Sequence, residues 1–404
     1  MSSIKLSSKE SVETLSAIFF LLLFPGFFFY HQSVAAGLFP RFLGGFFSPI
    51  CLVAVVMYMP FWRFWWNLFS SSPIYSVLLI FFLVWSASSA FITYWLYPTE
   101  YMDEALYQYL NTALIWVALV FVGAGLRFEK VWFRRVLWVS GAAIFLFLFH
   151  YVVTTGSLQY YAAQLYEVEE GVASYQGFSR SSLVIAFALF AISKSSKSQF
   201  LVSAASIFVL FVLAARSEFV AIIVCVAAFL IIRSRKEKKK MFAIIILGVF
   251  AIAISVGSYN RLESTRQANL FDLQHDSSWQ ARMGKNEDAF SRIKQSFFIG
   301  DFGAHFESGG KGSYAHNIMS VWDAFGLFGF ASYCLLVILP LCCSLKLNFS
   351  NDCLNERTAM YFFLSLSVVV LLLASKSIYW VAPALAWGFY FNVGKAKKHQ
   401  KINI

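Results

Sequence analysis

The sequence predicts an all-α polytopic membrane protein. Three observations support this fold class. Apolar residues make up 59% of the 404 residues and charged residues only 13%, whereas soluble domains carry about 25% charged residues. Many uncharged runs reach about 17–22 residues, long enough to cross a hydrocarbon layer as a helix. The alternation of apolar and polar residues that a transmembrane barrel needs is absent.

The apolar runs predict about twelve transmembrane helices and a GT-C-like arrangement. The chain from 200 to 232 is too long for one span, so we expect a tight reversal at Ala215–Glu218. The division expected is nine helices in 1–257, a large polar loop in 258–316, and three helices with a basic tail in 317–404. The predicted spans are 14–31, 43–60, 74–96, 107–126, 136–155, 179–194, 199–215, 217–232, 241–257, 317–343, 359–375 and 377–394.

The positions of the basic residues predict the orientation. Most of the 32 lysines and arginines fall in short loops on one side of the twelve-span arrangement, including the run 233–240 and the tail 395–401. Short cytoplasmic loops are enriched in these residues. Both termini are therefore expected in the cytoplasm and the long loop outside. Because the basic residues cluster between spans, the net charge of +11 does not indicate a nucleic-acid partner.

The long loop is expected to contain an amphipathic helix. Apolar residues follow helical spacing through 276–298, and Ser277 or Ser278 could cap its start. Glycines at 309, 310 and 312 then permit a tight backbone. The helix carries Arg282 beside further basic residues, and we expect Lys285, Arg292 and Lys294 to form a solvated face.

Two arginines near the outer ends of spans are candidates for binding an anion. Arg180 begins one predicted span, and Arg216 lies in the reversal between two. Charges near a membrane interior often mark a substrate site, and a guanidinium can hold a phosphate through two hydrogen bonds. The simpler interpretation is that each contacts lipid headgroups, or that Arg216 pairs with Glu218.

His316 is the candidate proton acceptor. Its imidazole titrates near neutral pH and could take a proton from a hydroxyl nucleophile. It precedes a predicted helix for which Asn317 is a suitable N-cap, so a structural role is the alternative. Asp323 follows within the apolar run and could orient His316, although seven residues of helix separate the two by about 10 Å.

Several signatures of other classes are absent from the sequence. No Asp-x-Asp motif and no Cys/His cluster with metal-ligand spacing occurs, and there is no P-loop. We therefore expect no metal and no cofactor.

Three features stand out: Arg216 at the reversal between two predicted spans, the motif Tyr314-Ala-His-Asn317, and the Gly326-Leu-Phe-Gly329 that follows it. Together they resemble the O-antigen ligase and polymerase superfamily. The resemblance covers about 175–335 and is closest to the O-antigen polymerases of the Wzy-dependent pathway. It implies an inverting, metal-independent membrane glycosyltransferase whose donor is a glycan on undecaprenyl diphosphate. It also implies a bacterial inner-membrane location with a periplasmic site, contact with membrane lipids, and a chain-length regulator protein as a partner.

Site roles follow from the same resemblance. His316 and Arg216 correspond to the catalytic residues, with His316 acting on the acceptor hydroxyl. Arg180, Arg282, Tyr314 and Asn317 correspond to residues that bind the diphosphate or the glycan. Two alternatives stay open: an O-antigen ligase, which transfers the glycan to lipid A-core, and a flippase or transporter of lipid-linked glycans. The absence of inverted-repeat symmetry argues against the transporter, and a purely structural membrane protein is the weakest alternative.

Overall fold

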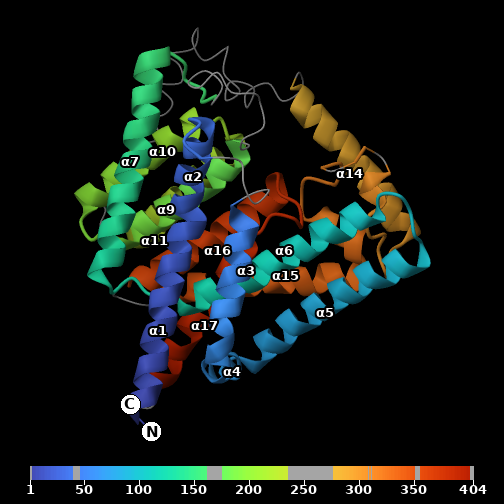
Figure 1. Ribbon diagram of the computed structural model, residues 1–404, viewed down its shortest axis with the longest axis horizontal. Coiled ribbons are helices and arrows are strands. Elements are labelled where there is room, and N and C mark those ends of the chain that lie inside the picture. Colours follow the sequence, from blue (N-terminus) through green and yellow to red (C-terminus); the bar gives the residue numbers. More distant parts are fainter. Residues whose placement is uncertain are drawn as a thin grey trace.

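The computed structural model describes residues 2–39, 46–161, 175–234, 276–307, 309–310, 312–350 and 355–400. Within these residues every regular element is a helix (Figure 1). The all-α polytopic class predicted from the sequence is therefore confirmed. The predicted span 241–257 and the first part of the long loop, 258–275, lie outside the described residues.

Seven stretches of the described chain are long and apolar enough to cross a membrane, and two shorter apolar helices accompany them. The N-terminal one joins three elements: α1 (Ser2–Leu21), the π-helical turn η1 (Leu22–Gly26) and α2 (Phe27–Ala35). The remaining elements are α3 (Phe47–Tyr58), η2 (Met59–Phe61), α4 (Trp62–Phe69), α5 (Pro73–Leu96), α6 (Met102–Gly125), α7 (Val131–Thr155), α9 (Tyr175–Ile192), α10 (Ser196–Val212), α11 (Arg216–Ser234), α14 (Ser277–Gln295), η4 (Ala304–Phe306), α15 (Met319–Ser350), α16 (Glu356–Ala374) and α17 (Ala382–Gln400).

Helices α6 and α17 cross closely at two glycines. A Cβ atom at Gly123 would lie 2.5 Å from the Leu385 carbonyl oxygen, and one at Gly388 would lie 2.3 Å from the Val120 carbonyl oxygen. Small residues permit such an approach, which is a common packing device between membrane helices. Asn392 on α17 donates to the Gly123 and Leu126 carbonyl oxygens at 3.0 and 2.7 Å.

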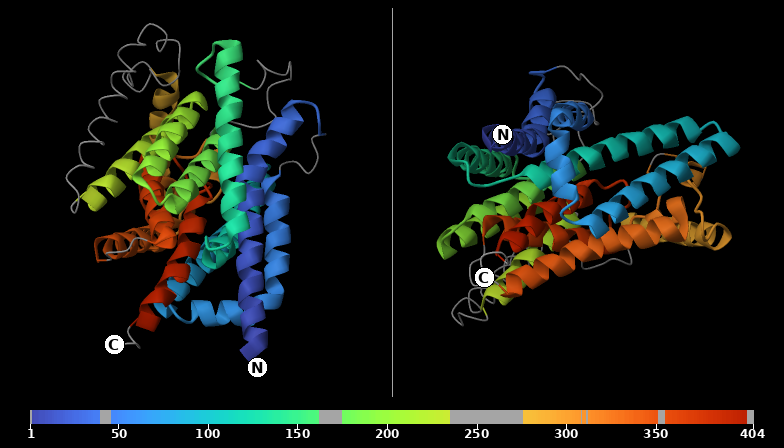
Figure 2. Two further views of the ribbon diagram at one scale, coloured as in Figure 1. Left: turned by 90° about the vertical axis from the view of Figure 1, so that its left-hand side faces the viewer. Right: turned by 90° about the horizontal axis from the view of Figure 1, so that it is seen from below.

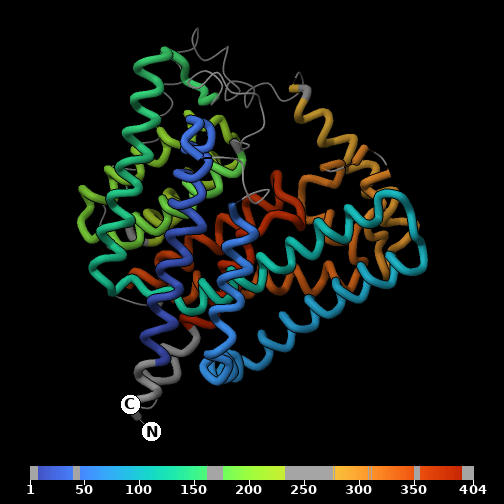
Figure 3. Tube along the Cα trace, viewed as in Figure 1, coloured from blue at the N-terminus to red at the C-terminus, as the bar shows by residue number. Residues whose placement is uncertain are grey.

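The helical bundle has two ends, and one of them holds the segment that joins α14 to α15. Helices α5, α6 and α15 run side by side, and the α5–α6 connection lies next to the segment that follows α14 (Figures 1 and 2). There Gly303 packs against Met102 and Ala105, and Tyr101 donates to Glu307. We call this the site end. Helices α1 and α17 run toward the opposite end (Figures 1 and 3).

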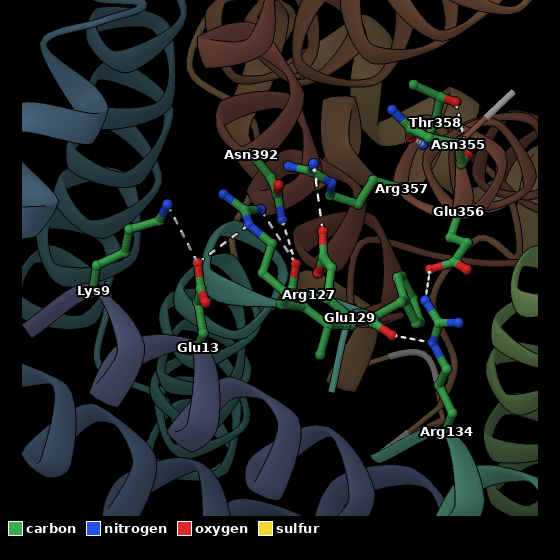
Figure 4. A network of polar contacts seen from close by, with 12 residues as sticks. Lys9, Glu13, Arg127, Glu129, Arg134, Asn355, Glu356, Arg357, Thr358 and Asn392 are labelled. Atoms are coloured by element: carbon green, nitrogen blue, oxygen red, sulfur yellow. Dashed lines mark hydrogen bonds and ion pairs between the residues drawn. The ribbon is translucent and has the colours of Figure 1, made fainter. Parts of the chain in front are cut away.

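The opposite end is held by a network of charges around the α6–α7 connection (Figure 4). Glu13 on α1 lies 3.6 Å from Arg127, and Glu356 on α16 lies 2.6 Å from Arg134. Arg357 approaches Glu129 at 3.5 Å. These contacts fix the connection to α1 and α16, so α6 is anchored at the end remote from the site.

Helix α15 is broken at Gly326, although the sequence predicts one continuous span over 317–343. Gly326 has φ 65° and ψ −169°, a conformation that is essentially restricted to glycine. A Cβ there would lie 2.1 Å from the Phe298 carbonyl oxygen. Gly300 faces it across the turn after α14, with φ 80°. The Leu327 amide donates to the Phe297 carbonyl oxygen at 3.0 Å, which joins this turn to the break.

We expect Gly326→Ala to lower the free energy of unfolding by about 3 kcal/mol or more, because it combines a forbidden backbone conformation with a steric overlap. Thermal unfolding in detergent measures the effect. The matched control is Gly284→Ala in α14, where a Cβ meets no atom within 4 Å. That change should raise stability by about 0.5–1 kcal/mol. Equal stabilities for the two variants would contradict the role given to Gly326.

Candidate functional site

The corner between α10 and α11 positions Arg216. Helix α10 ends at Val212, and α11 begins at Arg216. Between them Ala214 has φ 54°, a left-handed conformation that lets the chain reverse within a few residues. The reversal expected from the sequence is therefore present, and it places Arg216 in the first turn of α11.

Arg216 forms an ion pair with Asp276 through both terminal nitrogens. Its Nη1 lies 2.6 Å from Oδ2 and its Nη2 lies 3.2 Å from Oδ1 of Asp276. The Asp276 side chain is only 3% exposed. Asp276 is also the N-cap of α14, where its Oδ1 accepts from the Trp279 amide at 2.7 Å. The expected cap at Ser277 or Ser278 is wrong because the helix already includes both serines.

A second ion pair lies beside the first. Lys376, between α16 and α17, is 2.6 Å from Glu218, whose side chain is 2% exposed. Ser217 donates to the other Glu218 oxygen at 2.8 Å. The alternative in which Glu218 pairs with Arg216 is therefore wrong. Lys376 was not among the site residues expected from the sequence, because a single lysine in a short loop gives no local signal of a distant carboxylate.

These groups surround a small polar cavity of about 30 Å³. Its charged lining consists of three cations and one carboxylate, and the Asp276 carboxylate lies against one of these cations. Arg282 on α14 contributes to the lining, which brings this arginine to the same place as Arg216. The lining residues are Gln176, Ala214, Ala215, Arg216, Ser217, Glu218, Arg282 and Lys376.

Arg180 lies on α9 one turn after Gln176, which lines the cavity, but is not itself part of the lining. Its guanidinium carbon is 4.3 Å from the Phe47 ring centroid and 5.6 Å from that of Phe27. Aromatic faces stabilise a cation by cation–π attraction. Within the described parts of the chain no carboxylate lies within ion-pair distance of Arg180, although Glu218 is close enough to act on it electrostatically.

His316 lies in the segment that leads into α15 and is partly buried. Burial, together with the positive charges of Arg282, Lys285 and Lys376, lowers its pKa to about 4, while a hydrogen bond to the Gly312 backbone opposes the shift. His316 is therefore uncharged at neutral pH. The three cations act on it from α14 and from the α16–α17 connection, which places His316 within the electrostatic reach of the cavity.

An aromatic cluster packs against His316. The Tyr314 ring centroid lies 5.2 Å from that of His316, 5.6 Å from His305 and 5.0 Å from Tyr379. Burial raises the pKa of Tyr314, and a hydrogen bond with Ser377 opposes this. Burial lowers the pKa of His305 to about 3, and Arg292 contributes to the shift. His305 was not among the site residues expected from the sequence, because it belongs to no motif recognised there.

Asn317 caps the start of α15. Its Oδ1 accepts from the Met319 amide at 2.9 Å, and its carbonyl oxygen accepts from Ser320 Oγ at 2.8 Å. Ser320 Oγ in turn accepts from the Ile378 amide at 2.8 Å. Asn317 therefore holds the α16–α17 connection, which carries Lys376, against the start of α15. Its assignment to substrate binding remains a prediction.

Arg292 and Asp323 form a bidentate ion pair at 2.9 and 2.7 Å, with side chains 15% and 5% exposed. The expectation that Arg292 belongs to a solvated face is wrong, because Asp323 lies beneath this side of α14. Asp323 consequently holds α14 to α15 rather than orienting His316.

Lys285 also departs from the solvated face expected for it. Its ammonium donates to the Gly312 carbonyl oxygen at 2.9 Å, which fixes the glycine-rich segment before His316. Lys294 is exposed, as expected, and lies over the Phe290 ring at 4.6 Å. Within the described ranges no group of three or more His, Cys, Asp or Glu side chains could hold a metal ion.

Fold and site together define a multi-pass helical membrane protein with a cation-lined cavity and a neutral histidine at one end. A family model described as O-antigen ligase matches residues 201–334, about a third of the chain. The matched stretch includes α11, α14, the histidine segment and the Gly326 break. It supports the ligase and polymerase superfamily and does not distinguish its two activities. Comparison with curated proteins finds no match.

We expect the pKa of His316 to be about 4, so the ring should stay neutral from pH 7 down to that value. NMR titration of labelled histidine in detergent measures it. Arg282→Gln should raise this pKa because it removes one nearby cation, whereas Lys294→Gln should leave it unchanged. Between pH 6.5 and about 4 the unfolded chain binds a proton that the folded chain does not. Stability should therefore fall as the pH is lowered through this range. A pKa near 6.5 would contradict the site geometry.

We expect Arg292→Gln to lower the free energy of unfolding by about 3 kcal/mol, because it leaves the Asp323 carboxylate buried without its cation. The double variant Arg292→Gln/Asp323→Asn should recover part of this loss, since no charge remains buried. Unfolding in detergent measures all variants. Lys294→Gln, an exposed change on the same helix, should stay within about 0.5 kcal/mol of wild type. Simple additivity of the two single changes would argue against the pair.

Proposed function

We propose that the protein is an O-antigen polymerase that joins repeat units carried on undecaprenyl diphosphate. The observation that carries this proposal is the cavity shared by Arg216, Arg282 and Lys376, with a neutral His316 beside it. Clustered cations suit a diphosphate, and a neutral imidazole can accept a proton. The family match supports the superfamily to which such polymerases belong.

The proposed reaction is an inverting glycosyl transfer. A hydroxyl of the acceptor repeat unit attacks the anomeric carbon of the donor glycan. The bond between that carbon and the diphosphate oxygen breaks, and undecaprenyl diphosphate leaves with the electron pair. The acceptor proton passes to His316. Arg216 and its neighbouring cations stabilise the negative charge that develops on the leaving group, which is the task that a metal ion performs in other transferases.

Because the pKa of His316 is low, its ability to act as a base depends on whether the donor is bound. A base with a pKa of about 4 is weak at neutral pH. A bound diphosphate would offset the charges of Arg282 and Lys376, two of the cations that lower this pKa. The pKa of His316 would then rise toward the value at which a base is most effective. In this mechanism donor binding prepares the base.

The remaining residues have supporting roles in this proposal. Arg180 is a further cation, one turn along α9 from Gln176 in the lining of the cavity. Tyr314 presents an aromatic ring next to His316, a surface suited to a sugar face. Asn317 retains its amide nitrogen for a glycan hydroxyl while its oxygen caps α15.

The proposed setting is the bacterial inner membrane. Both termini face the cytoplasm, and the site end faces the periplasm, where lipid-linked repeat units are joined. The partners proposed are the undecaprenyl-diphosphate-linked oligosaccharide, the surrounding lipids and a chain-length regulator protein.

A ligase is the second candidate, because the matching family model is described as O-antigen ligase. Its donor chemistry would use the same cations and the same histidine. Only the acceptor differs, which for a ligase is lipid A-core. The described cations act on the donor diphosphate, and His316 takes the proton of whichever hydroxyl attacks, so these residues are equally suited to both candidates.

The test is a lipopolysaccharide gel from bacteria that depend on this chain, complemented with wild type, Arg216→Gln, His316→Gln or the exposed control Lys294→Gln. A polymerase predicts core carrying a single repeat unit in the first two variants, and a full ladder in the control. With purified protein, loss of a leaving-group cation should lower the rate by about 10²–10³-fold, and loss of the base by about 10²–10⁴-fold. Membrane levels of each variant serve as the folding control.

Other patterns on the gel would indicate one of the alternative functions or would contradict the proposed site. Bare core with polymer accumulating on the carrier lipid would indicate the ligase. Carrier-linked units retained on the cytoplasmic face would indicate a transporter. A full ladder from both variants at normal protein levels would show that the cavity and His316 are not part of the chemistry.

A further inference from the structure

Asp276 occupies the face of Arg216 that would bind an anion. Both terminal guanidinium nitrogens contact the carboxylate, at 2.6 and 3.2 Å. This two-point geometry is the one through which arginine also holds a phosphate. A diphosphate and the Asp276 carboxylate therefore compete for the same pair of donors.

The cavity beside this pair is too small for the ligand proposed for it. Its volume is about 30 Å³, which accommodates about two water molecules at 10–15 Å³ each. A diphosphate group has nine phosphorus and oxygen atoms and cannot enter that space. Binding consequently requires one of the elements around the cavity to move.

The N-terminal half of α14 buries fewer of its described side chains than the C-terminal half. Trp279 and Met283 are 36% and 44% exposed, and a Cβ at Gly284 would meet no atom within 4 Å. From Ser278 onward the first fully buried side chain of the helix is Ala289, followed by Ile293. The C-terminal half is also fixed, because Arg292 pairs with Asp323 on α15. Figure 1 shows this C-terminal end beside α15.

We infer that Asp276 is an internal substitute for the donor diphosphate. In the resting protein its carboxylate neutralises Arg216 and fastens the start of α14 to α11. An arriving diphosphate takes the two donors of Arg216, Asp276 withdraws with the N-terminal half of α14, and the cavity opens. The inference rests on the proposed function, since it assigns an anionic donor to this cavity.

The exchange does not require α14 to unfold. Asp276 Oδ1 accepts from the Trp279 amide within the same helix turn, and this cap moves with the helix. Arg216 keeps an anionic partner throughout, first the carboxylate and then the diphosphate. Arg216 is therefore not left as an unpaired cation at either stage, which lowers the cost of the exchange.

A different role for Asp276 makes the opposite prediction. If Asp276 positions Arg216 for the ligand, removing its charge should weaken anion binding. If Asp276 is a competitor, the same change should strengthen it. Asp276→Asn separates the two, because asparagine is as good an N-cap as aspartate and retains the start of α14.

The experiment titrates the full-length protein in lipid nanodiscs with inorganic pyrophosphate as the probe, using tryptophan fluorescence or calorimetry. We expect Asp276→Asn to bind about fivefold more tightly than wild type, because no carboxylate then competes for the two donors of Arg216. Glu287→Gln is the matched control. It removes the same charge from an exposed position on the same helix and should leave the affinity unchanged.

Hydrogen exchange of backbone amides gives an independent readout. In wild type, pyrophosphate should accelerate exchange in 277–284 and leave 289–295 unchanged. In Asp276→Asn the first segment should exchange faster without any ligand. Uniform protection of α14 on binding would overturn the inference.

The outcomes separate this inference from the function it rests on. Equal or weaker binding by Asp276→Asn, with binding abolished by Arg216→Gln, would overturn the substitution role and leave the anion site intact. Undiminished binding by Arg216→Gln, or no binding by wild type and Asp276→Asn alike, would remove the anion site itself and with it the basis of the proposed function.

Discussion

The cost of holding charged groups beside a hydrocarbon layer governs the organisation of the site end. A charge there is stable only when it is paired or solvated. Asp276, Glu218 and Asp323 are each less than a tenth exposed, and each has a basic partner from another element. The three pairs join α11 to α14, α11 to the α16–α17 connection, and α14 to α15. The same contacts that neutralise the charges therefore also assemble the cavity.

The sequence was sufficient for the fold class but not for these pairs. Hydropathy over about 20 residues is a local property, so helices and the reversal before Arg216 could be predicted. Arg216 and Asp276 are 60 positions apart, and Arg292 and Asp323 are 31 apart, so pairing depends on tertiary packing that no local pattern encodes. The solvated face expected for Arg292 failed for this reason. The break at Gly326 was missed because the backbone that packs against it, at Phe298, is likewise remote from it along the chain.

The site depends on elements that extend far beyond it. Helix α6 begins at Met102, which packs against Gly303 in the segment leading to the histidines, and it crosses α17 where Gly123 meets Gly388. Its far end is held by the Glu13–Arg127 contact. The loops around His316 are thus supported by a helix that is fixed along its length. By contrast, the first fully buried side chain of α14 from Ser278 onward is Ala289, so burial is distributed unequally around one cavity.

The short corner between α10 and α11 has a consequence for the order in which the ion pairs form during synthesis. Only Leu213, Ala214 and Ala215 separate the two helices, so the hairpin can form as soon as both helices have left the ribosome. Its corner carries Arg216 and Glu218, whose opposite charges balance each other at that stage. Their final partners, Asp276 and Lys376, leave the ribosome later. The hairpin is therefore electrically balanced before the later elements arrive and supply the ion pairs of the complete structure.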